Sequence, residues 1–140
     1  MKQGFWILLL MVTIFSCKEG FNHPPEIKVL KTGKPYPLQP GGHNIEIVVN
    51  EIQDSRCPMN AICFWPGYAQ VFFEIRADSE TIKDSLSIPE YRKLGQYSHK
   101  YYDLDGVRYA LTLTEVVPYP CHNCPIAPKE QKAVFRIFRY

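Results

Sequence analysis

The five cysteines carry most of the chemistry that this chain of 140 residues could perform. Cys17 comes just after an apolar run, Cys57 and Cys63 lie close together, and Cys121 and Cys124 form a Cys-x-x-Cys pair. A cysteine can be lipidated, close a disulfide, ligate a metal or act as a redox nucleophile. The surrounding residues must therefore decide which of these roles each cysteine has.

The N-terminal residues 1–16 have the pattern of a bacterial signal peptide. Lys2 provides a positive charge, and the apolar run from Phe5 to Phe15 that follows is broken only by Thr13. A run of this length matches the apolar region of a signal peptide and is too short to span a bilayer. We therefore predict that residues 1–16 target the chain for export and are then removed.

The residues before Cys17 resemble the lipobox of bacterial lipoproteins, with an aliphatic Ile14 and a small Ser16 ahead of the cysteine. This resemblance implies that Cys17 receives a diacylglyceryl group and becomes the first residue of the mature chain. Two acyl chains hold a protein durably on a membrane, whereas a single chain does not. The alternative is an ordinary secretory signal that happens to contain a cysteine near its end.

Polar residues without periodicity follow Cys17, as expected of a tether. We assign residues 17–24 to a lipidated tether and residues 25–140 to the folded domain. Lys18 and Glu19 resemble a signal that sends some lipoproteins to the cell surface. We therefore expect the protein in the bacterial cell envelope, anchored by lipid in the outer membrane, with display at the cell surface if this second resemblance holds.

Length and composition favour one β-rich domain for the rest of the chain. Hydrophobic residues make up 46% of the sequence, which is enough for a core, and the nine Tyr and eight Phe favour strands over helices. The formal net charge is only +2, and the acidic and basic residues are interspersed. We therefore expect no nucleic-acid partner and no attraction to an anionic surface through charge.

Apolar and polar residues alternate along several segments, which is the pattern of strands with one buried face. The clearest segments are residues 45–50, 69–76, 107–113 and 133–139, and the weaker ones are residues 26–31, 81–87 and 97–103. Asp105-Gly106 predicts a tight hairpin turn between two of them. The prolines and glycines from Pro35 to Gly42 predict an irregular connection.

One short helix is predicted near the middle of the chain. Ser87 and Glu90 form a capping box, and Gly95 is placed as the glycine that ends a helix. About seven strands and this helix predict an all-β domain, a single antiparallel β-sandwich of immunoglobulin-like size.

The four cysteines that remain after lipidation favour disulfides, because their number is even and the compartment is oxidising. Three pairings are possible. Cys121, His122 and Cys124 could instead hold a zinc or copper ion, although this set is short of a fourth donor. Redox catalysis and haem attachment are less favoured, because prolines place the Cys-x-x-Cys pair in a loop and Pro125 occupies the position where a haem motif has histidine.

The segment around Cys57 resembles a motif of small, largely uncharacterised bacterial secreted proteins and lipoproteins, D-S-R-C-P, four residues, C-x-W-x-G. The matching residues are Asp54, Ser55, Arg56, Cys57, Pro58, Cys63, Trp65 and Gly67. The resemblance implies a compact β domain and no particular activity. It also treats Cys57 and Cys63 as a set, which leaves Cys121 and Cys124 as the second pair.

Two interpretations of this motif remain open. In the structural one, the two cysteines staple a loop, Trp65 packs beneath it, and Asp54 and Arg56 pair with each other or cap backbone amides. In the functional one, Asp54 and Arg56 are an exposed recognition pair and Trp65 is an aromatic anchor for a partner.

No catalytic residue and no cofactor are expected, because the sequence contains no recognised nucleophile motif, metalloprotease motif or phosphate-binding loop. Two functions remain. The first is a non-catalytic envelope lipoprotein that serves as a structural module or binds a protein, a glycan or a small ligand. The second is a metal-handling or thiol-redox accessory protein that uses the loop containing Cys121 and Cys124.

Overall fold

The computed structural model describes residues 25–38, 44–89, 98–124 and 130–140. The described residues form eight β-strands, which are β1 (Glu26–Lys31), β2 (Pro35–Leu38), β3 (Ile45–Asp54), β4 (Tyr68–Arg76), β5 (Thr81–Pro89), β6 (Ser98–Leu104), β7 (Val107–Val117) and β8 (Lys132–Arg139). No helix long and apolar enough to cross a membrane is found in this part of the chain. The predicted signal peptide, Cys17 and the tether lie outside the described residues.

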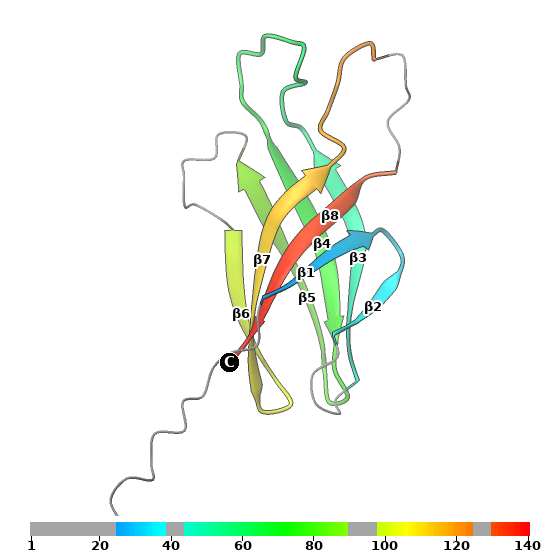
Figure 1. Ribbon diagram of the computed structural model, residues 1–140, viewed down its shortest axis with the longest axis vertical. Helices are drawn as coiled ribbons and strands as arrows, with labels where there is room; N and C mark the ends of the chain where they lie inside the picture. The colour runs from blue at the N-terminus through cyan, green and yellow to red at the C-terminus, as the bar shows by residue number, and fades with distance from the viewer. Residues whose placement is uncertain (1–24, 39–43, 90–97, 125–129) are drawn as a thin grey trace, which may run out of the picture.

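The strands form two antiparallel sheets that pack face to face (Figure 1). One sheet has the order β1-β8-β7-β6 and the other has the order β2-β3-β4-β5. Along β4, buried residues alternate with more exposed ones, as the period of two requires when one face of a strand is covered. The predicted antiparallel β-sandwich is therefore confirmed.

The core lies between the two sheets, and its centre is aromatic. Phe73 of β4 makes edge-to-face contacts with Tyr102 of β6 and Phe135 of β8, at centroid distances of 6.3 and 5.6 Å. These contacts cross from one sheet to the other. The buried core cluster runs from Leu30 to Ile137 and so lies wholly within the domain assigned to residues 25–140.

All seven predicted strands form, and β3 and β7 extend several residues beyond their predicted ends. The eighth strand, β2, falls where an irregular connection was predicted, so that part of the prediction is wrong. Pro35 and Pro37 obscured it in the sequence, because proline cannot donate to a strand ladder. A strand at the edge of a sheet tolerates proline, and β2 pairs on one side only, with β3.

The hairpin turn at Asp105-Gly106 is confirmed. Leu104 pairs with Val107 across it, and the two turn residues have φ angles of 48° and 78°. Positive φ at both central residues is the geometry that fits the twist of two joined strands.

The predicted helix does not begin where its capping box is placed. Ser87, Ile88 and Pro89 are instead the last residues of β5, paired with β4. Pairing with a neighbouring strand satisfies their backbone groups and overrides the local capping signal. The rest of the predicted helix, including Glu90 and Gly95, lies outside the described residues.

Polar contacts join the two sheets along one side, where the edge strands β5 and β6 meet. Asp84 of β5 accepts hydrogen bonds from the ammonium group of Lys100 at 2.5 Å and from the hydroxyl of Tyr102 at 2.9 Å, both on β6. Burial alone would raise the pKa of Asp84. The bonds from Lys100, the Ser85 N–H and Tyr102 outweigh that effect, so the pKa of Asp84 lies below its ordinary value.

Along the other side the chain itself crosses between sheets, from β1 to β2. Thr32 forms an isolated bridge with Val49 of β3, and the Gly33 N–H donates to the Val49 carbonyl at 2.8 Å. The sandwich is thus held on both sides. At one of its ends, the β3–β4 loop (residues 55–67) and the segment that follows β7 (residues 118–124) project together (Figure 1).

The first testable consequence concerns Asp84. Asp84→Asn should lower the free energy of unfolding at pH 7 by about 2 kcal/mol, because charge-assisted hydrogen bonds to a half-buried carboxylate are lost. The folded-state pKa lies below the unfolded value of 3.8. The stabilisation by Asp84 is therefore present above that pH and disappears as the pH falls below it.

Urea unfolding of both proteins from pH 7 to pH 2.5 would measure this difference. Asp103→Asn is the control, because its ion pair with Arg108 is exposed and should matter much less. A constant difference between wild type and Asp84→Asn across the whole pH range would contradict the assignment.

Candidate functional site

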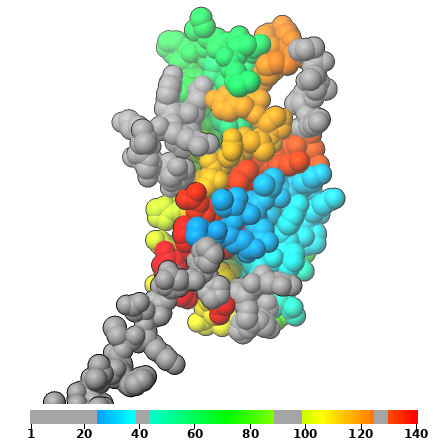
Figure 2. Space-filling view, in the orientation of Figure 1, coloured from blue at the N-terminus to red at the C-terminus, as the bar shows by residue number. Residues whose placement is uncertain are grey.

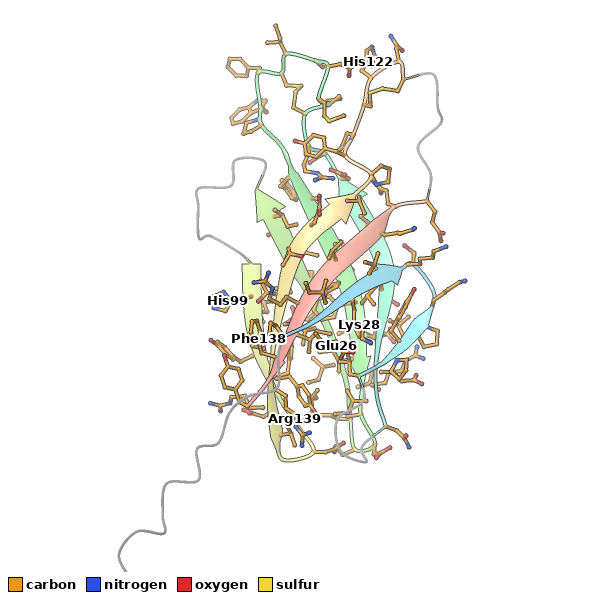
Figure 3. The ribbon with its side chains drawn as sticks, viewed as in Figure 1. Glu26, Lys28, His99, His122, Phe138 and Arg139 are labelled. Carbon is orange, nitrogen blue, oxygen red and sulfur yellow. A yellow bond between two sulfur atoms is a disulfide. The ribbon has the colours of Figure 1, made fainter. Side chains whose placement is uncertain are left out.

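Each of the two projecting loops contains one disulfide. Cys57 pairs with Cys63 in the β3–β4 loop, and Cys121 pairs with Cys124 after β7, both with Cα atoms 5.9 Å apart. This is the pairing expected from the motif resemblance. His122, labelled in Figure 3, lies on the second loop at the same end of the sandwich.

A buried ion pair lies at the base of the loops. The Arg56 Nε and Nη2 atoms donate to the two Asp54 carboxylate oxygens at 2.8 and 2.6 Å, so the contact is bidentate. The side chains are only 4% and 2% exposed. The interpretation of Asp54 and Arg56 as an exposed recognition pair is therefore wrong, because a partner could not reach either charged group.

The same pair also connects the two loops. The Arg56 Nη2 atom donates to the Val116 carbonyl at 2.8 Å, and the guanidinium group lies 4.2 Å from the ring centroid of Tyr119. The Gln131 amide donates to Asp54 at 3.2 Å. Val116 and Tyr119 lie at the end of β7 and just after it, and Gln131 lies just before β8. The Asp54–Arg56 ion pair, where β3 leads into its loop, therefore contacts residues at both ends of the β7–β8 connection.

Ser55 and Gly67 close the neck of the first loop. The Ser55 N–H and hydroxyl both donate to the Tyr68 carbonyl at 2.9 Å. Gly67 has a φ of 74°, and a Cβ atom at this position would lie 1.9 Å from the Ser55 carbonyl oxygen. Only glycine allows the two strands of the neck to approach this closely.

The two loops also contact each other near their tips. The Met59 N–H donates to the Pro120 carbonyl at 3.1 Å. The Asn60 side chain makes two hydrogen bonds with the backbone of His122. The Asn60 amide nitrogen donates to the His122 carbonyl, and the Asn60 side-chain oxygen accepts from the His122 N–H at 2.8 Å. The two disulfides and these hydrogen bonds between the loops together hold the two loops in one arrangement.

Large apolar side chains project from the first loop into solvent. Ile62 and Phe64 are 105% and 93% exposed, Trp65 is 76% exposed and Met59 is 72% exposed. We call these four residues the apolar tip. The β3–β4 loop forms the projection at one end of the molecule in Figure 2, coloured green. Trp65 therefore does not pack beneath the staple as the structural interpretation predicted, and it contacts Phe64 edge to face instead.

The described residues of the two loops carry no exposed formal charge, and the nearest exposed ion pair, Lys31 with Glu130, lies beside the start of β8. Residues 57–73 and 116–124 contain no Asp, Glu, Lys or Arg. In the part of the chain that the structure describes, no group of three or more His, Cys, Asp and Glu side chains could hold a metal ion. The metal hypothesis for Cys121, His122 and Cys124 requires two thiolates, whereas these two sulfurs are bonded to each other. The apolar tip can bury apolar surface against a partner.

Several residues of this site were missed by sequence reasoning. Asn60, Tyr119 and Gln131 gave no local signal, because their partners lie far away in the chain. The apolar tip did give one. Four large apolar side chains fall in a segment bounded by Pro58 and Pro66, which cannot continue a strand, and apolar residues in such a loop are candidates for exposure.

The neck of the loop offers a controlled test. Gly67→Ala should lower the free energy of unfolding by about 3 kcal/mol or more, because positive φ and a steric clash add together. Gly33→Ala has nearly the same φ, 73°, with no atom near the added Cβ. It should cost only about 1 kcal/mol. Chemical denaturation measures both, and equal losses would contradict the tight neck.

The second loop offers another test. Replacing Cys121 and Cys124 with Ala should leave the domain folded and cost about 2 kcal/mol, since the ring is short. In the denatured wild type, the thiols of all four paired cysteines should become titratable only after reduction. One zinc or copper ion per chain in a chelator-free preparation, lost in the double variant, would instead favour the metal-handling function.

Comparison with known proteins finds no relative on which to base a function. No protein-family model matches the chain, and neither a curated protein nor a solved structure matches it significantly. The function must therefore be inferred from the residues and geometry of the domain itself.

Proposed function

We propose that the protein is a lipoprotein of the bacterial envelope, held on the membrane through Cys17, whose folded domain is a non-catalytic binding module. The apolar run of the signal peptide and the lipobox-like residues before Cys17 support the anchor. The outer membrane is the proposed location, with Lys18 and Glu19 supporting display at the cell surface.

The exposed apolar tip is the observation that carries the binding function. Large apolar and aromatic side chains that stay in water cost free energy, and they are usually retained where a partner covers them. The Cys57–Cys63 disulfide and the hydrogen bonds between Asn60 and His122 hold the loop that carries these side chains. A preorganised loop loses little conformational entropy on binding, so more of the contact energy becomes affinity. The candidate ligands are a protein, a glycan or a small molecule.

The chemistry of the loops favours binding over catalysis. Asp54 and Arg56, the charged residues of the motif, are committed to each other in a buried site. The sulfurs of Cys121 and Cys124 are joined, which disfavours the metal-handling and thiol-redox alternative. No described nucleophile with a base beside it lies at the tip, and no cofactor is proposed.

The anchor is tested by lipid labelling in a bacterial host. Wild-type protein should incorporate labelled fatty acid and sediment with membranes, because Cys17 supplies the thiol for the lipid. Cys17→Ser should do neither. The apolar run is the same in both proteins, and only the thiol that would carry the lipid is lost. A difference between wild type and variant therefore reports lipidation and not membrane retention of an uncleaved signal peptide.

A control variant, Cys57→Ser with Cys63→Ser, should still be labelled. Labelling of Cys17→Ser equal to the wild type would refute lipidation at this residue.

A further inference from the structure

We infer that the apolar tip inserts into a lipid bilayer, and that this bilayer is the one that holds the lipid on Cys17. The inference rests on the proposed function for its choice of bilayer. It gives the domain two points of attachment, the lipid at the N-terminus and the stapled loop.

The tip has the order of side chains that suits a bilayer surface. Ile62 and Phe64, which have no polar group, are almost completely exposed. Trp65 and Tyr68, which combine an apolar ring with a polar atom, come next along the chain, and Tyr68 begins β4 and is half exposed. Trp and Tyr concentrate at the boundary between lipid and water. The loop thus passes from apolar to amphipathic residues as it approaches the sheet.

Insertion of this loop would bury no unpaired charge, and part of its backbone is already hydrogen-bonded. No residue from 57 to 73 is charged, and Arg56 just before them is already paired. The N–H groups of Cys57, Met59 and Ala61 donate to carbonyls of Pro66, Pro120 and Pro58. Pro58 and Pro66 have no N–H to satisfy. These groups therefore add no penalty when the loop enters lipid, and the tip needs to reach only the boundary between lipid and water, where its other backbone groups stay hydrated.

A protein partner fits these observations less well. Protein interfaces surround their apolar core with a rim of hydrogen-bonding side chains. Here the side chain of Asn60 is occupied by the His122 backbone, and no charged side chain lies in either loop beyond the buried Arg56. A projecting apolar tip without charged side chains in the described part of either loop matches a fluid apolar phase, which needs no shape complementarity.

The tether is long enough for the lipid to reach the end of the sandwich from which the loops project. From Cys17 to Glu26 the chain can reach about 30 Å when extended. From Glu26, β1 rises about 17 Å to Lys31. Lys31 pairs with Lys132 at the start of β8, and Lys132 also pairs with Val117 at the end of β7, where the second loop begins. The extended tether is longer than β1 by about 13 Å, so the lipid can pass the level at which the projecting loops begin. Attachment through the lipid also keeps the tip at a high effective concentration beside the same bilayer.

Trp65 provides a direct readout. The chain has two tryptophans, and Trp6 lies in the predicted signal peptide, so Trp65 is the one that remains after cleavage. Residues 25–140, which contain the whole described core, should be mixed with phosphatidylcholine vesicles. The emission of Trp65 should shift to the blue and be quenched by brominated lipid. The shift should be the same in high salt and with added phosphatidylglycerol, because no charge takes part.

Matched variants distinguish insertion of the apolar tip from nonspecific adsorption of the domain to lipid. Ile62→Ser with Phe64→Ser should weaken vesicle binding at least about tenfold, since two large apolar side chains no longer enter lipid. Both side chains are exposed, so the fold should be kept. Ile27→Ser with Val29→Ser removes two exposed apolar side chains of β1 and should leave binding unchanged. No spectral shift in the wild type, or equal loss in both double variants, would overturn the proposal.

The choice of bilayer is tested with the lipidated full-length protein in dilute proteoliposomes. Trp65 should show the blue-shifted, lipid-quenched emission without any added vesicles. If the emission shifts only when a second population of vesicles is added and clusters with the first, the tip faces another membrane and the same-bilayer proposal is wrong. If residues 25–140 bind vesicles but Cys17 carries no lipid, the anchor fails while insertion of the tip stands.

Discussion

The buried ion pair between Asp54 and Arg56 is the interaction on which the functional end of the domain depends. Removing two charges from water is costly, and the cost is offset only when every remaining hydrogen-bonding group finds a partner. Here those partners are the Val116 carbonyl, the ring of Tyr119 and the amide of Gln131. They come from both ends of the β7–β8 connection. The pair is therefore satisfied only when both loops are in place, so it selects one arrangement of them.

The other features of this end support the same arrangement by different means. The disulfides limit each loop separately, and the contact of Asn60 with the His122 backbone joins them. Gly67 allows the neck to close at a distance that no side chain would permit. With the side chains of Asp54, Arg56 and Asn60 used internally, the apolar tip is left facing outward. A stable, polar base supporting an exposed apolar tip is consistent with a binding surface, because buried polar networks resist the rearrangement that would otherwise hide the tip.

Much of the fold was predictable because strand patterns are local. Alternation of apolar and polar residues located β4 and β8 within one residue, and the Asp-Gly pair located the β6–β7 turn. Where the local signal and the sheet disagreed, the sheet prevailed. Proline hid β2, whose place at a sheet edge makes proline acceptable, and a capping box at Ser87 proved to be the end of β5. Edge position and pairing are properties of the whole sheet, so no short window of residues contains them.

The sequence by itself determined seven of the eight strands, the sandwich and the set of residues in the stapled loop. Only the tertiary structure decided which of those residues face solvent. Arg56, a charged residue, is buried, and Trp65, an aromatic one, is exposed, which reverses the usual preference of both. The reason is the range of the contacts involved. Arg56 meets Val116 across 60 residues of chain, and Asp54 meets Gln131 across 77. Burial in a loop is set by such distant partners and leaves no local pattern, whereas burial along a strand alternates residue by residue and can be recognised in a short stretch of sequence.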